Sequence, residues 1–243
     1  MDTRPADDEE RVSDSGPVDD RHHREQDRLP LFPLSSPLFP GMSLPLHIFE
    51  ERYRTMLGER EDVDPVFGIV LTRSGREVGD QPAIHDIGTA ATLLGVRMYD
   101  DGRADIAVRG TRRFRVIQTD WSGPYLVADV EWLPDETADD GSLTALADRT
   151  RSAMLRLVAV AAHAGNLPVP DLRLPGGPTD LGFLLSRTLW LNTWERQELL
   201  ELPTTRARLE RLAVIIHRER RMLTVAGASG TPIDHPGSRF LPN

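Results

Sequence analysis

The chain of 243 residues contains neither cysteine nor lysine. The missing cysteine excludes disulfides, thiolate metal sites and a cysteine nucleophile. Because lysine is missing, all 29 basic side chains in the Lys+Arg count are arginines. A Walker-type phosphate loop needs a lysine, a Schiff base needs an amine, and a Ser–Lys peptidase dyad needs lysine as its base. This chain can supply none of these three groups.

Long apolar runs are also missing. No stretch approaches the roughly 18 apolar residues of a membrane span, and the N-terminus is acidic and polar, without the basic and apolar regions of a secretory signal. We therefore expect a cytoplasmic protein that makes no contact with a membrane. The 39% hydrophobic content of a chain of this length allows a substantial core in one or two domains.

Charge is unevenly distributed along the chain. Residues 1–28 hold ten acidic residues and five arginines with few apolar side chains, so we expect this segment to be a disordered acidic tail. It carries more than half of the net charge of −9. Glycine and proline are frequent at the other end, which predicts a second, loose tail at 225–243.

The most informative segment runs from Leu29 to Leu57. Its prolines fix φ and withhold backbone N–H groups, so it can be neither a continuous helix nor a central strand. We predict a short edge strand, a turn and a bend. Beyond the last proline, apolar residues at 49, 53, 56 and 57 fit the buried face of one short helix, which Gly58 can end. The prolines are Pro30, Pro33, Pro37, Pro40 and Pro45.

Two periodicities divide the rest of the chain. Apolar and polar residues alternate through much of 66–133, as they do in half-buried strands, and Tyr99–Gly102 supplies a hairpin turn. Beyond an acidic loop at 135–140, the apolar period becomes helical, with four helices expected. Strands followed by helices indicate a segregated α+β fold. We expect a small barrel with one early helix at 29–134 and a helical subdomain at 141–224.

The proline-rich segment resembles the opening of the N-terminal, substrate-binding domain of the ATP-dependent protease Lon. The family has an LPLFPL-like strand, a PGM-like turn and a PLHIFExRYR-like strand and helix. The matching residues are Leu31, Pro33, Leu34, Pro40, Gly41, Pro45, Leu46, Phe49, Glu50, Arg52 and Tyr53.

Two later stretches extend this resemblance to roughly residues 28–222. Residues 101–116, with Gly102, Arg113 and Phe114, look like the family's hairpin and "GxxRF" strand, while 194–201 and 208–212 look like its helical part. The resemblance implies a PUA-like barrel and a stand-alone recognition module that performs no catalysis and needs no cofactor. It also implies binding of unfolded or degron-bearing polypeptides, as an adaptor or regulator in protein quality control, with a protease or chaperone as a further partner. The oligomeric state stays open.

Four apolar residues on the proline-bounded loops are the candidate peptide-binding residues. Loops run near the surface, so these side chains either close one end of the barrel or form an exposed apolar patch. In the second case they would hold an extended apolar peptide, together with a cleft between the two subdomains. The four are Phe32, Phe39, Met42 and Leu44.

An arginine cluster supports an alternative, RNA-binding function of the PUA-like class. Arg109, Arg112, Arg113 and Arg115 lie close together, and Arg113 and Arg115 share one face of a strand. The competing interpretation is a solvated outer face whose arginines pair with acidic residues such as Glu131. Interleaved aromatic residues for base stacking are missing and the folded part is net negative, so nucleic acid is the weaker interpretation.

The remaining polar motifs predict neither a metal site nor a catalytic centre. His47 and Glu50 are three residues apart, but no third ligand is close in sequence. No Gly-x-Ser-x-Gly, His-Glu-x-x-His or phosphate-binding loop occurs. Arg52 or Arg54 could instead have a structural role, by fixing the carbonyl groups of the Pro40–Gly41 turn.

Overall fold

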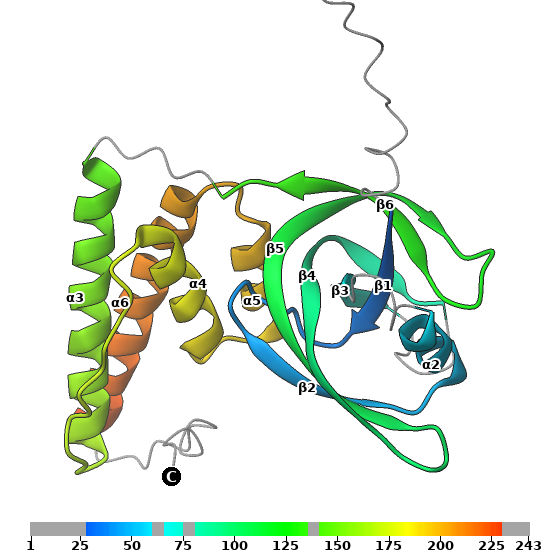
Figure 1. The fold of residues 1–243 in the computed structure, drawn as a ribbon. Coiled ribbons are helices and arrows are strands. Elements are labelled where there is room, and N and C mark those ends of the chain that lie inside the picture. Colours follow the sequence, from blue (N-terminus) through cyan, green and yellow to red (C-terminus); the bar gives the residue numbers. More distant parts are fainter. Residues whose placement is uncertain (1–27, 60–65, 75–80, 136–140, 230–243) are drawn as a thin grey trace, which may run out of the picture.

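A computed structural model of the chain describes residues 28–59, 66–74, 81–135 and 141–229. A ring of strands lies beside a group of helices, which confirms the α+β class (Figure 1). No described helix is both long and apolar enough to cross a membrane. The strands are β1 (Arg28–Leu34), β2 (Ser43–Ile48), β3 (Val66–Ser74), β4 (Ala83–Met98), β5 (Ala104–Asp120) and β6 (Val127–Leu133). The helices are α2 (Glu51–Gly58), α3 (Ser142–Ala164), α4 (Pro178–Thr188), α5 (Thr193–Glu201) and α6 (Thr205–Ser229).

The strands close into a ring that is not a regular barrel. β1 pairs in parallel with β3, and the order continues antiparallel through β4, β5 and β6 back to β1. The 17-residue β5 is long enough to pair with three strands. It pairs with β4 and β6, and its first part also pairs with β2. β2 contains Pro45 and pairs only with β5 among the described strands, as an edge strand does.

The prediction that the first proline-rich strand lies at an edge is wrong. β1 has a partner strand on each side, but the two partners pair with different halves of it. Residues 28–30 pair with β6, and residues 31–34 pair with β3. Each half of β1 therefore has one side that forms no hydrogen bonds to a neighbouring strand, and a proline without an N–H is tolerated there. The early helix is present as α2, but Phe49 precedes it and is 50% exposed, so Phe49 is not part of its buried face as predicted.

Two glycines make room for one of the buried aromatic side chains inside the ring. Phe114 of β5 is fully buried, and its ring lies against Gly68 of β3 and Gly88 of β4. A Cβ atom added at Gly68 or Gly88 would approach Phe114 Cζ to 2.6 or 2.7 Å, closer than side-chain atoms pack. Glycine at these two positions therefore leaves the space that the Phe114 ring fills.

The helices form a separate core in which α3 and α6 lie side by side (Figure 1). Asn192 caps α5 with a capping box that includes Glu195. α6 continues to Ser229, so the predicted loose tail cannot start at 225; residues 230–243, like the acidic segment 1–27, lie outside the described residues. The predicted subdomain bounds otherwise stay predictions.

Buried charged side chains fill the junction between ring and helices. Arg113 of β5 and Arg208 of α6 are both fully buried, and Asp135 contacts them at 2.8 and 3.6 Å (Arg113 Nη2 and Arg208 Nη2 to Asp135 Oδ1). Arg113 also donates to the carbonyl oxygen of Leu200, in the last turn of α5, and to that of Leu202, just after this helix. The solvated position predicted for Arg113 is wrong, because the helices cover this part of the outer face of β5.

Candidate functional site

The predicted peptide-binding residues do not form an exposed patch. Phe32 is 7% exposed and stacks on Tyr53 at a ring centroid distance of 4.0 Å, so it closes the ring interior. Phe39 is fully buried and belongs to the helical core. Met42 is partly buried between both cores, and Leu44 is partly buried against the ring core. The patch interpretation is therefore wrong for Phe32 and Phe39, and a binding role for Met42 and Leu44 stays a prediction.

The Pro40–Gly41 turn is held by backbone contacts and by a helical arginine. Gly41 has φ of +74°, a left-handed conformation that favours glycine, and its N–H donates to the carbonyl oxygen of Gly110 at 2.8 Å. Arg187 of α4 donates to the Gly41 carbonyl oxygen. The arginine at this turn is therefore Arg187, and neither Arg52 nor Arg54 as proposed from the sequence.

Arg52 and Arg54 have other partners. Arg52 pairs with Glu50 at 3.0 Å and its guanidinium lies 4.6 Å from the centroid of the Tyr53 ring. Arg54 crosses the β4–β5 turn at Gly102, where φ is +79° and an added Cβ would lie 2.0 Å from Arg54 Nη2. Glycine at 102 thus allows the turn and also lets Arg54 lie across it.

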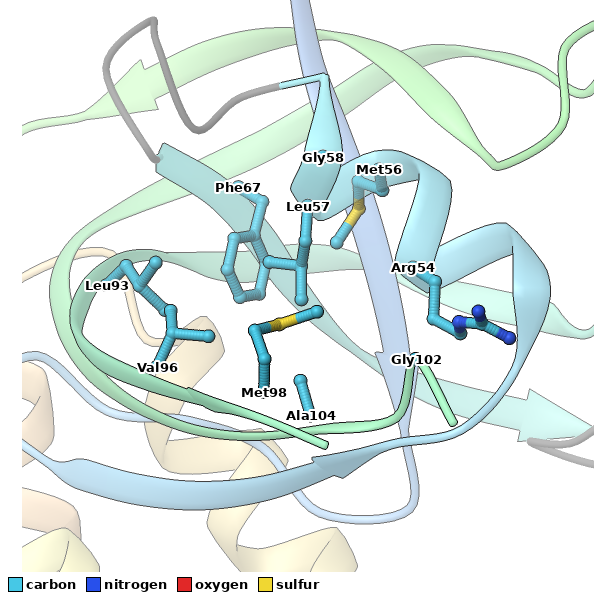
Figure 2. Close-up of a pocket in the computed structure, with 10 residues that line it drawn as sticks. All are labelled: Arg54, Met56, Leu57, Gly58, Phe67, Leu93, Val96, Met98, Gly102 and Ala104. Atoms are coloured by element: carbon cyan, nitrogen blue, oxygen red, sulfur yellow. The ribbon is translucent and has the colours of Figure 1, made fainter. Parts of the chain in front are cut away.

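Arg54 borders an apolar pocket between α2 and the β4–β5 hairpin, which we call the α2–β4 pocket (Figure 2). Its volume is ≈ 90 Å³, and Arg54 is the one charged residue among the described residues that line it. Val96 and Met98 of β4 are 44% and 63% exposed although their side chains are apolar. The lining residues are Arg54, Met56, Leu57, Gly58, Phe67, Leu93, Val96, Met98, Gly102 and Ala104.

A bulge in β4 directs the apolar side chains into the pocket. The β4–β5 register shifts between Leu93 and Gly95, so one residue is inserted there. Without the bulge, Leu93 and Val96 would point to opposite faces of the strand, because side chains alternate. With it, Leu93, Val96 and Met98 all line the same pocket (Figure 2).

Sequence reasoning identified this hairpin but missed the pocket. The run Leu93-Leu94-Gly95-Val96-Arg97-Met98 carries four large apolar residues. Such a run in a hairpin next to a turn is a signal for an apolar surface. The pocket could not be recognised from the sequence for two reasons. The bulge breaks the two-residue alternation of β4, and the facing residues Met56, Leu57 and Phe67 come from another part of the chain.

The arginine cluster does not form a continuous basic surface. Arg115 pairs with Glu131 at 2.8 Å, as the competing interpretation proposed, and Arg113 is buried at the junction. The Arg112 guanidinium lies 3.6 Å from the centroid of the Trp132 ring. The RNA-binding alternative therefore loses one of the four arginines of the cluster on which it rested.

His47 and Glu50, for which the sequence predicts no metal site, have different partners. His47 Nδ1 lies 2.6 Å from Asp105 Oδ1, whereas Glu50 pairs with Arg52. Hydrogen bonds from Tyr99 and from His47 lower the pKa of the Asp105 carboxyl group below its usual range. Within the described ranges, no group of three or more His, Asp or Glu side chains could hold a metal ion.

Comparisons with known proteins agree on one family. Residues 28–218 match the model of the ATP-dependent protease La (LON) substrate-binding domain. The chain is 28% identical over 202 residues to Lon protease 2 of Syntrophobacter fumaroxidans. This alignment covers 82% of this chain and 25% of that protein. The chain is 26% identical over 208 residues to Lon protease 2 of Myxococcus xanthus, with 82% and 24% covered. The chain thus spans about a quarter of the length of these curated relatives.

Two solved structures have a similar fold. A Lon N-terminal domain protein from Xanthomonas campestris has a TM-score of 0.55 at 28% sequence identity, covering 77% of this chain and 97% of that one. The N-terminal domain of a Mycobacterium avium complex Lon protease has a TM-score of 0.57 at 19% identity, covering 78% and 98%. The second likeness concerns the fold alone.

Proposed function

This chain belongs to the family of substrate-binding domains of the ATP-dependent protease La (LON), and from that premise we propose that it binds unfolded or degron-bearing polypeptides in the α2–β4 pocket. The observation that carries this proposal is the apolar lining itself. Val96 and Met98 stay largely exposed on a strand, beside a hollow of ≈ 90 Å³. Exposed apolar surface of this kind marks interaction sites.

The chemistry of the pocket suits a variety of apolar partners. Met56 and Met98 have flexible, polarisable thioether side chains that adapt to different shapes. Burying one large apolar side chain contributes about 1.5–3 kcal/mol, which is less than the roughly 4 kcal/mol of a millimolar complex. The pocket alone therefore gives weak binding with low selectivity. Such binding is appropriate for a module that samples many non-native chains.

A recognition role without catalysis follows from this proposed binding. The chain would perform no chemistry on its partner and would act as an adaptor or regulator that presents non-native polypeptides to a protease or chaperone. Weak, reversible binding supports this role, because a polypeptide must leave the recognition module before it can be processed elsewhere.

Replacing Met98 with aspartate is expected to weaken binding of an apolar polypeptide at least tenfold. A carboxylate beside Leu57 and Phe67 must be desolvated when the partner covers the pocket, and about 1.4 kcal/mol of that cost already changes affinity tenfold. The measurement is fluorescence anisotropy of a labelled, permanently unfolded protein titrated with the full chain.

Met222→Asp is the matched control. Met222 lies on α6, away from the pocket, and is 48% exposed, so the same chemical change is made at a comparably exposed methionine. Its affinity should equal that of the wild type, and both variants should keep the wild-type melting temperature within a few degrees. Wild-type affinity in Met98→Asp, or equal losses in both variants, would contradict the proposed site.

A further inference from the structure

We infer that the α2–β4 pocket receives its polypeptide as an added β-strand, which pairs with the open edge of β4 at residues 93–98. The inference rests on the proposed function and specifies the conformation and chemical character of the segment that binds. It follows from the strand pairing, from the direction of two backbone groups and from the side chains beside them.

The last part of β4 is paired on one side. β5 pairs with β4 from Ile87 to Met98, whereas β3 pairs with it only from Ala83 to Thr92. Among the described strands, none pairs with residues 93–98 on the side opposite β5. Within the described ranges, these residues therefore form a strand edge next to the pocket.

The backbone groups of Val96 and Met98 face this open side. At the hairpin turn, the Tyr99 N–H donates to the Arg103 carbonyl oxygen at 2.9 Å, so Tyr99 faces β5. In an antiparallel pair, alternate residues direct their N–H and C=O groups to the partner strand. Arg97, which is opposite Asp105, therefore faces β5 like Tyr99. Val96 and Met98, opposite Ile106 and Ala104, direct their N–H and C=O groups away from β5.

The same two residues direct their side chains into the pocket (Figure 2). An added strand would thus exchange main-chain hydrogen bonds with Val96 and Met98 while its own side chains on that face enter the pocket. Among the described residues, no heavy atom lies within 4 Å of a Cβ atom built at Gly95 or Gly58, so the described part of the chain leaves space beside both glycines.

Residues 93–98 have few of the features that usually protect a strand edge exposed to water. Strand edges exposed to water are ordinarily protected by prolines, by several charges or by a bulge that twists the edge away. Here Arg97 is the one charged residue between Leu93 and Met98, and the bulge turns apolar side chains toward the pocket. The edge and the pocket therefore form one surface for an extended segment.

Charge and shape specify the segment further. Arg54 is the charged residue among the described lining residues, where Glu51 pairs with it at 3.1 Å, and Arg97 lies on the edge strand. A lysine or arginine of the bound segment would meet like charge beside Arg97 and, in part, beside Arg54. Carboxylates next to the side chains that enter the pocket would meet opposite charge. The occupant is thus an extended segment with apolar, β-branched or aromatic residues at alternate positions, without basic side chains at those positions.

N-methylation of a peptide tests strand addition without changing the protein. The probe is a ten-residue, fluorescein-labelled peptide that alternates valine and serine, with blocked ends. One version carries N-methyl groups on two central valines and a second carries them on two central serines. In an added strand, only alternate N–H groups bond to β4, so methylation of one set should lower affinity about tenfold or more and methylation of the other set less than twofold.

The outcomes separate this inference from the proposed function. Equal losses in both methylated peptides, combined with weaker binding of the unmethylated peptide to Met98→Asp, would overturn strand addition and leave the pocket in place. An unmethylated peptide that fails to bind the wild-type chain at millimolar concentration would overturn the proposed function itself. A loss restricted to one set supports the inference, and which set it is reports whether the added strand is parallel or antiparallel.

Discussion

Asp135→Asn is expected to lower the free energy of unfolding by about 3–5 kcal/mol, because it leaves two buried guanidinium groups without the carboxylate that contacts both. Arg113 and Arg208 are fully buried, so water cannot replace the lost charge. Asparagine keeps the shape of the side chain. The expected loss is therefore electrostatic and does not include the cost of a cavity.

The ionisation of these arginines supports this expectation. Burial lowers the pKa of Arg113, and burial together with the nearby charge of Arg113 lowers the pKa of Arg208 to about 10. Asp135 raises the pKa of both groups and so offsets part of that penalty. Replacing the carboxylate removes this contribution and leaves the repulsion between the two buried guanidinium groups without an opposing charge.

Glu131→Gln is the matched control for Asp135→Asn. Glu131 pairs with Arg115, which lies two residues from Arg113 on β5, at the same 2.8 Å nitrogen–oxygen distance, but both side chains are about half exposed. Such surface pairs contribute at most about 1 kcal/mol. Urea denaturation of the two variants measures the difference. Equal losses would show that the junction is not held by its buried charges.

Phe114→Ala is expected to lower the free energy of unfolding by about 3–5 kcal/mol. Phe114 is fully buried in the strand ring, and Gly68 and Gly88 shape the space that its aromatic ring fills. The neighbouring strands cannot collapse into that space without breaking the ladders that close the ring. Most of the volume of the lost side chain should therefore remain as a cavity, which adds to the lost transfer free energy.

Ile117→Ala provides the comparison, because Ile117 lies on the same strand and is 62% exposed. Surface substitutions of this kind change stability by less than about 0.5 kcal/mol. Both variants can be measured by urea denaturation under the same conditions. A loss below about 1 kcal/mol for Phe114→Ala would mean that the ring repacks freely and that its two glycines do not define a fixed site.

The sequence predicted the fold class because its strongest signals are local. Proline positions, the 99–102 turn and the change from a two-residue to a helical period each depend on neighbours in the chain. The strand β1 shows the limit of this reasoning. Two of its prolines argued for an edge strand, and only the tertiary arrangement lets each half of β1 pair on a different side.

The candidate site could be predicted only in part, because it depends on contacts between distant residues. Arg113 looked like a surface arginine, since the period of a strand cannot show that the end of α5 and the residues after it, 87 to 90 positions later in the chain, cover that face. Phe39 looked like a loop residue, although it belongs to the helical core. The α2–β4 pocket combines residues of α2, β3 and β4, and a bulge conceals its alternation.

The measurement that tests the central claim most directly is residue-resolved amide hydrogen exchange of the full chain, with and without a bound unfolded polypeptide. We expect slower exchange at Val96 and Met98, whose N–H groups face the open edge, and little change at Arg97, whose N–H already faces β5. Protection confined to other parts of the surface, such as α3 and α6, with unchanged exchange along residues 93–98, would contradict polypeptide recognition at the α2–β4 pocket.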